Sequence, residues 1–197
     1  MLKEEYIKNP SKASSLPFWK TNSITTNKKT SIIDKPYDDS LNKYYFKLVH
    51  YLNGVEKPIL DSKFELVNIS IIKYANHINS CYDNIHISCE ELENYKNHSV
   101  YDDALCLAIQ DKDNSKIVAT GIAEIDKDIK EGTIEWVQVS KEYRRKGLGE
   151  YIVRELLYRL KDKATFVTVS GDCNNPSKPN CLYKKCGFTN ETIWQIE

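Results

Sequence analysis

All four arginines of this 197-residue chain lie within one short stretch, residues 144–159, although 24 lysines are spread along its length. Two of these arginines open a basic turn with two glycines, which reads Arg144, Arg145, Lys146, Gly147, Leu148 and Gly149. Glycine lets backbone N–H groups approach an anion closely, and a helix N-terminus favours negative charge. Because an apolar stretch (133–139) precedes the turn and an amphipathic stretch (150–161) follows it, the pattern predicts a phosphate-binding turn between a strand and a helix.

Two common phosphate motifs do not fit this turn. A P-loop requires the pattern G-x-x-x-x-G-K-[ST], which the chain lacks. A dinucleotide-binding fingerprint requires a third glycine at the position of Ile152, and its strand–turn–helix belongs at the start of the chain rather than its middle. The pattern that remains is [Arg/Gln]-x-x-Gly-x-Gly directly after a strand.

The chain from about residue 61 has the periodicity of an α/β domain. Helices are expected at 70–82, 88–95, 150–162 and 181–186, and strands at 64–69, 104–110, 117–125, 133–139, 165–170 and 192–196. Ser88 and Glu91 form a capping-box signature at the start of the second helix. This order of elements predicts a mixed sheet flanked by helices.

The first 60 residues follow a different pattern. Residues 7–40 are polar and proline-marked, with one apolar cluster at 16–19, and we expect them to wrap a core as an N-terminal extension. Residues 44–52 are rich in β-forming side chains and predict a strand.

Composition excludes several classes of function. The 28 basic and 28 acidic side chains cancel, so no global field favours nucleic acid or an anionic membrane. No stretch approaches 18 apolar residues and the N-terminus lacks the apolar core of a signal peptide, so a cytoplasmic location is expected. The six cysteines would then be reduced, and without a C-x-x-C pair they predict no metal site.

A second motif follows the glycine turn downstream, and its residues are Leu182, Tyr183, Lys184, Lys185, Cys186, Gly187 and Phe188. With both motifs, the chain resembles the GNAT superfamily of acyl-CoA-dependent N-acyltransferases. The resemblance covers 61–197 in element order, with sharp matches confined to 135–188, and it leaves 1–60 outside. It implies an α/β fold with a mixed, mostly antiparallel sheet flanked by helices, and an N-acetyltransferase that uses acetyl-CoA.

The resemblance also implies which residues bind the co-substrate. The amides of the glycine turn would bind the pyrophosphate of acetyl-CoA, with Arg145 an extra positive charge. The backbone of Val137 and Val139 would pair with the pantetheine arm, and an N–H there would polarise the thioester carbonyl. Gln138, between the two valines, belongs to the same edge. The loop before the second motif departs from the family pattern, so either Asn174 or Asn175 could be the family's asparagine; Asn175 is our candidate.

The resemblance places Tyr183 as the general acid. A tyrosine has an ordinary pKa of about 10, so it stays protonated at neutral pH and can donate to the departing thiolate. Glu135 is the best candidate for the general base, since simple alternation places it on the same strand face as Val137 and Val139. A bulge would break that parity, and Glu124 and Ser170 are weaker alternatives.

The expected reaction is direct transfer of an acetyl group to a primary amine, on a small molecule or a peptide. Residues 70–103 would shape the acceptor site, and their acidic side chains fit either a cationic amine or a solvated helix face. A non-catalytic acyl-CoA sensor and an interaction module carried by 1–60 are the alternatives. A homodimer is also possible through an unpaired terminal strand or the N-terminal arm.

Overall fold

The computed structural model describes residues 1–23, 30–33, 43–83 and 85–196. In these residues one eight-stranded sheet runs through the molecule in the order β1-β8-β2-β7-β6-β5-β4-β3. The strands are β1 (Thr30–Ile32), β2 (Lys43–His50), β3 (Phe64–Leu66), β4 (Cys106–Asp111), β5 (Lys116–Asp126), β6 (Glu131–Val139), β7 (Phe166–Asp172) and β8 (Thr189–Ile196). Neighbouring strands are antiparallel except β6 and β7, which are parallel.

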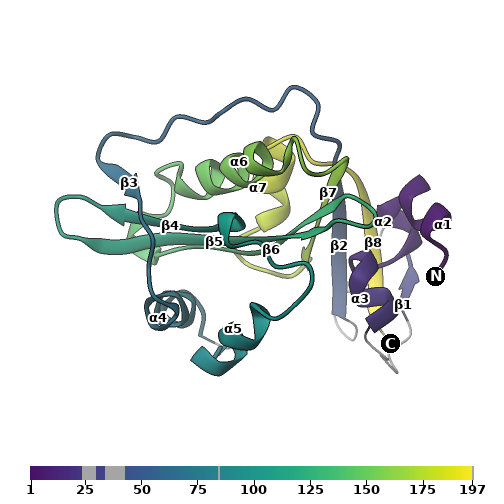
Figure 1. Cartoon of the computed structure of the whole chain (residues 1–197), viewed down its shortest axis with the longest axis horizontal. Helices are drawn as coiled ribbons and strands as arrows, with labels where there is room; N and C mark the ends of the chain where they lie inside the picture. The colour runs from purple at the N-terminus through teal and green to yellow at the C-terminus, as the bar shows by residue number, and fades with distance from the viewer. Residues whose placement is uncertain (24–29, 34–42, 84, 197) are drawn as a thin grey trace.

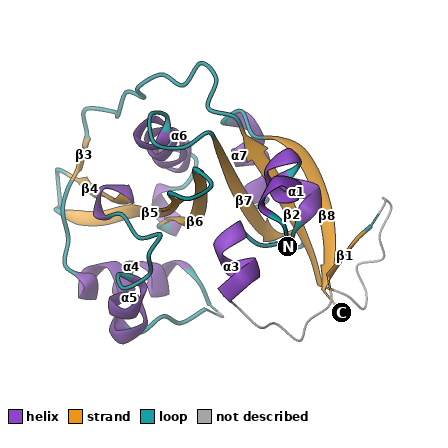
Figure 2. Ribbon diagram, turned by 45° about the vertical axis from the view of Figure 1, so that its right-hand side comes forward, coloured by secondary structure: helices purple, strands orange, loops and turns teal. Residues whose placement is uncertain are grey.

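Helices cover both faces of the sheet (Figures 1 and 2). The helices are α1 (Lys3–Lys8), α2 (Pro10–Ala13), α3 (Phe18–Ser23), α4 (Ile71–Cys81), α5 (Cys89–Tyr95), α6 (Leu148–Leu160) and α7 (Pro179–Lys185), with short 3₁₀ turns at Asp103–Leu105 and Lys141–Tyr143. The first three and α4 with α5 lie on one face, and α6 with α7 lies on the other. The fold is therefore the mixed, mostly antiparallel sheet that the sequence predicts. No helix in the described residues is long and apolar enough to span a bilayer.

The main core lies between the sheet and α6. The apolar stripe of this helix, at positions such as Ile152, Leu156 and Leu160, is fully buried against β5 and β6. Gly121 in β5 permits this approach, because a Cβ at that position would lie 2.3 Å from a methyl carbon of Ile152. The helix that carries the glycine turn is thus held rigidly against the strands.

Most predicted elements from residue 61 onward are present with ends shifted by a few residues, and the capping box at Ser88 is confirmed. The strand predicted at 44–52 is β2, an interior strand between β7 and β8. Three short helices in the first 23 residues were not predicted, and they pack on the sheet through side chains such as the fully buried Tyr6. The division of the chain at residue 60 stays a prediction, although β2 lies before it.

The parallel strands β6 and β7 separate partway along their length. Their pairing ends at Ile134 and Val169, but β6 continues to Val139 and β7 to Asp172. Beyond this point β7 remains paired with β2, and β6 remains paired with β5. The far part of β6 therefore has a free edge on its β7 side among the described residues, just before the glycine turn.

Candidate active site

The glycine turn forms the N-terminus of α6 as predicted. Gly147 is the N-cap of α6 and has a φ of 79°, a backbone conformation that residues other than glycine rarely adopt. No side chain caps this helix. A Cβ at Gly147 would meet no atom within 4 Å. The turn is therefore open at Gly147, which leaves room for an anion next to the N-terminus of α6.

The side chains of the turn have different surroundings. Arg144 donates a hydrogen bond from Nε to the carbonyl of Val139 at 3.2 Å, so it joins the turn to the end of β6. Lys146 lies with Nζ 4.5 Å from the ring centre of Tyr143, whereas Arg145 is exposed. Leu148 is buried in the core, so its contribution to an anion site is its backbone N–H.

The other two arginines form the ion pairs expected from their spacing on α6. Nε of Arg154 lies 3.0 Å from Glu150, and Nε of Arg159 lies 2.8 Å from Glu155. These arginines are thus held on the helix.

The free edge of β6 comprises the residues predicted to pair with pantetheine. Val137 and Val139 point toward α6 and pack against the main core, whereas the side chain of Gln138 points to the other face and is buried against Thr120. Backbone groups are what this edge can offer to an extended ligand.

A bulge in β6 overturns the expected orientation of Glu135. Ile134 pairs with Ala123 and Trp136 pairs with the adjacent Ile122, which leaves Glu135 as the extra residue. Its carboxylate lies on the α3 and α5 face, where Oε1 accepts a hydrogen bond from Lys20 at 2.7 Å. The prediction that Glu135 shares a face with Val137 and Val139 is wrong, because simple alternation fails at a bulge.

Glu124, the weaker alternative, is the buried carboxylate of the site. Its side chain is 1 % exposed, and Oε2 accepts a hydrogen bond from Nε1 of Trp19 at 2.9 Å. Oε1 has no hydrogen-bond partner within the part of the chain that the structure describes. Burial, followed by the negative charge of Glu135, raises the pKa of Glu124 to about 7.

Tyr183 is buried in the main core, on the side of the sheet that α6 covers. Its ring packs against Phe46 and Phe188, with centroids 6.2 and 5.7 Å away. Burial raises the pKa of Tyr183 above its ordinary value, and the nearby Tyr82, Cys186 and Glu135 raise it further. Among the described residues its hydroxyl makes no hydrogen bond, so this proton is available to a bound molecule.

The two remaining candidates are occupied by local contacts. Ser170 donates a hydrogen bond to the carbonyl of Ser15 at 3.2 Å, so its hydroxyl holds the N-terminal segment. Asn175 accepts hydrogen bonds from the backbone N–H and hydroxyl of Ser177, at 3.0 and 2.7 Å. Its carbonyl oxygen thus closes a turn in the loop before α7, which leaves its NH₂ group for any ligand.

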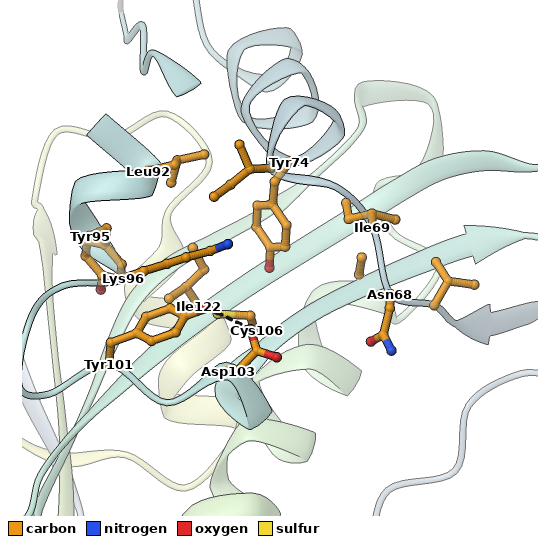
Figure 3. A pocket seen from close by; sticks show the side chains of 13 residues that line it. Asn68, Ile69, Tyr74, Leu92, Tyr95, Lys96, Tyr101, Asp103, Cys106 and Ile122 are labelled. Atoms are coloured by element: carbon orange, nitrogen blue, oxygen red, sulfur yellow. Dashed lines mark hydrogen bonds between the residues drawn. The ribbon is translucent and has the colours of Figure 1, made fainter. Parts of the chain in front are cut away.

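A pocket of about 120 Å³ lies between α4, α5 and the strands β4 and β5 (Figure 3). Apolar side chains and the rings of Tyr74, Tyr95 and Tyr101 line it. The hydroxyl of Tyr95 is buried without a hydrogen-bond partner in the described chain, and burial, followed by the charges of Glu135 and Glu124, raises the pKa of Tyr95. Tyr95 therefore connects the pocket to the carboxylate pair.

Sequence reasoning missed Trp19, Lys20 and Tyr95, which meet the carboxylates from α3 and α5. The apolar cluster at 16–19 was the available signal, because a tryptophan in a polar segment must pack against something.

Comparisons with known proteins agree with this geometry. The family model described as "Acetyltransferase (GNAT) domain" matches residues 102–190. Among solved structures, a GCN5-related N-acetyltransferase from Sphaerobacter thermophilus has a TM-score of 0.65 at 14% identity, covering 79% of this chain and 51% of that one. Glucosamine-6-phosphate N-acetyltransferase from Arabidopsis thaliana has a TM-score of 0.50 at 25% identity, covering 64% and 92%. The ribosomal-protein-S18-alanine N-acetyltransferase from Escherichia coli has a TM-score of 0.51 at 16% identity, covering 68% and 92%.

The chain spans about half the length of the first two structures it matches, 51% and 54%. A search of curated proteins found no matching sequence.

Proposed function

The chain belongs to the GNAT superfamily of acetyltransferases, and on that premise we propose that it transfers the acetyl group of acetyl-CoA directly to a primary amine. The observation that carries this proposal is the open glycine turn at the N-terminus of α6, which directly follows the free edge of β6. Burial raises the pKa of both Tyr183 and Glu124, and the charge of Glu135 raises each further.

The co-substrate would be held by backbone groups. The N–H groups at the start of α6, from Leu148 onward, would bind its phosphates in the open space before Gly147. Arg144 and Arg145 would add positive charge beside them, and the free edge of β6 would accept the extended arm as an added strand. Acetyl-CoA supplies an activated acetyl group, and the protein supplies its position.

We assign the general base to Glu124. An attacking amine must be neutral, and a carboxylate with a pKa near the working pH is best suited to take its proton. Glu124 has the raised pKa and the unpartnered oxygen that this role needs. Glu135 accepts a hydrogen bond from Lys20, and its negative charge helps to raise the pKa of Glu124.

Tyr183 would complete the transfer as the general acid. Its hydroxyl stays protonated because burial opposes the tyrosinate. As the C–S bond breaks, the sulfur leaves as a thiolate and takes this proton. Base and acid are then separate groups, so no acetylated enzyme intermediate is required.

An acceptor screen with radiolabelled acetyl-CoA tests the proposal. The panel should contain polyamines, amino acids, aminoglycosides, peptide N-termini and glucosamine 6-phosphate, the last because a matched structure is named for it. Labelled product and released CoA thiol are expected with at least one primary amine. CoA binding without thiol release on any amine would favour the alternative, a non-catalytic acyl-CoA sensor.

Gly147→Glu is expected to weaken CoA binding about tenfold or more, because it places a carboxylate and a strained backbone where the phosphates would lie. Calorimetry with CoA measures the effect. Gly54→Glu is the matched control, since Gly54 has a similar φ of 66° and equally open surroundings outside the turn. Equal CoA affinity in both variants would remove the argument from the phosphate turn.

Tyr183→Phe is expected to lower kcat by about 10–100-fold and to leave the affinity for acetyl-CoA nearly unchanged. Among the described residues the Tyr183 hydroxyl has no hydrogen-bond partner. Its removal therefore leaves no other polar group without a partner, and the melting temperature should change little. Steady-state kinetics with a saturating acceptor separates the effect on kcat from the effect on the KM for acetyl-CoA. Unchanged kcat would assign Tyr183 to packing.

A further inference from the structure

The N-terminal helix α3 contacts three acidic side chains of β5 and β6 through three consecutive residues. The backbone N–H of Phe18 donates to Glu131 at 2.9 Å. The Trp19 indole donates to Glu124 at 2.9 Å, and Lys20 donates to Glu135 at 2.7 Å. Trp19 also packs against His98, with ring centroids 5.2 Å apart. The helix thus lies on the face of the sheet that α4 and α5 also cover, which is the acceptor face of the proposed reaction (Figure 2).

Lys20 brings a primary amine to the bulge of β6, beside the strand edge that we assign to the acyl donor. Its partner Glu135 is the bulged residue of β6, adjacent to the strand edge assigned to the thioester arm. Nζ contacts Glu135 at 2.7 Å, and its positive charge also acts on Glu124, where it opposes the rise in pKa that burial causes. Oε1 of Glu124 is buried and unpartnered in the described chain, so this carboxylate has an oxygen free to accept a proton.

Other lysines of the described chain lack this combination. In every other lysine ion pair among these residues the lysine side chain is at least 44% exposed, compared with 20% for Lys20. Lys47 is more deeply buried, but its Nζ donates to three oxygens: the hydroxyl of Tyr6 and the carbonyls of Ser14 and Leu16. An amine with all three N–H groups engaged is poorly placed to become a nucleophile.

We propose that Lys20 is itself an acceptor, acetylated at Nζ by the active site that α3 covers. This inference rests on the proposed acetyl transfer, and it names a lysine of the same chain as one acceptor. Nζ is charged in its ion pair with Glu135, so it first loses one proton to solvent; the neutral amine then forms the C–N bond with the acetyl carbonyl carbon and gives a second proton to Glu124, which later returns it to the Tyr183 oxygen. The C–S bond breaks, its electron pair stays on sulfur, and Tyr183 protonates the thiolate. The products are N-acetyl-lysine and free CoA.

Acetylation would change how α3 is held. The amide product carries no positive charge, so the ion pair between Lys20 and Glu135 is lost and two negative carboxylates remain beside each other. Contacts of α3 such as the Trp19 hydrogen bond would then hold the helix against that repulsion. Modification of Lys20 is therefore expected to loosen α3 and to open the acceptor face to external amines.

The test is site-resolved mass spectrometry of the full chain incubated with acetyl-CoA and no added amine. We expect acetylation of Lys20 that is faster than that of the exposed Lys12 on α2 and independent of protein concentration. Tyr183→Phe should slow the modification of Lys20 by about tenfold or more and leave that of Lys12 unchanged. Lys20 that stays unmodified, or is modified equally fast in Tyr183→Phe, would overturn the inference.

The two proposals fail in different ways. Calorimetry with CoA and thiol release with the amine panel report on the enzyme whether or not Lys20 reacts. Turnover of an external amine with an unmodified Lys20 would reject the internal acceptor and retain the acetyltransferase. Absence of both CoA binding and Lys20 modification would reject the acetyltransferase proposal itself.

Discussion

Glu124→Gln is expected to reduce kcat/KM for the amine acceptor by about 10²–10⁴-fold, the range of a lost general base. The glutamine keeps the shape and can still accept the Trp19 hydrogen bond, so folding should be retained. In the unmodified protein kcat/KM, expressed per neutral amine because the neutral fraction of the acceptor itself rises with pH, should rise up to about pH 7 and then level off, since the carboxyl must lose its proton before it can act and its pKa is raised to that value. The variant should show no such rise.

Glu135→Gln is the matched control for this prediction. It removes the like charge that helps to raise the pKa of Glu124, so the pH profile should move to lower pH while most of the maximal rate remains. A large loss of rate in Glu135→Gln together with a small loss in Glu124→Gln would return the base to Glu135. Steady-state rates measured from pH 5 to 9 with both variants decide between the two carboxylates.

The phosphate turn could be predicted from the sequence because it depends on local rules. A strand must be followed by a turn that offers backbone N–H groups, and only glycine adopts the φ of 79° found at Gly147 without strain. The ion pairs of Arg154 and Arg159 likewise follow from helical spacing alone. Such features need no knowledge of what packs around them.

The base could not be assigned from the sequence, because its identity depends on a bulge and on a distant segment. One extra residue in β6 turns Glu135 to the face opposite Val137 and Val139, and alternation carries no signal of it. The burial that raises the pKa of Glu124 is completed by Trp19, 105 positions earlier in the chain. The effect of long-range contacts on a carboxylate becomes visible only in the folded chain.

Lys47→Met is expected to lower the free energy of unfolding by about 3–5 kcal/mol, the usual cost of removing one partner from a buried charge pair. Lys47 is 1% exposed, and burial lowers its pKa to about 8 while the charge of Glu131 opposes that shift. Tyr6 joins the two groups, since it accepts from Lys47 at 2.9 Å and donates to Glu131 at 2.6 Å. Urea denaturation measures the loss, and Lys43→Met, an exposed lysine on the same strand, should stay within about 0.5 kcal/mol.

A double-mutant cycle with Glu131→Gln distinguishes a charge pair from simple packing. Without Lys47 the buried carboxylate of Glu131 has lost its compensating charge, so its replacement by glutamine should recover part of the lost stability. The two effects should then differ from additivity by about 1–3 kcal/mol, whereas strict additivity would show that Lys47 acts through packing alone. Lys47 also holds the carbonyls of Ser14 and Leu16, directly before α3. The same Lys47→Met variant should therefore expose the segment before α3 to limited proteolysis, which links the stability of this buried network to the closure of the acceptor face.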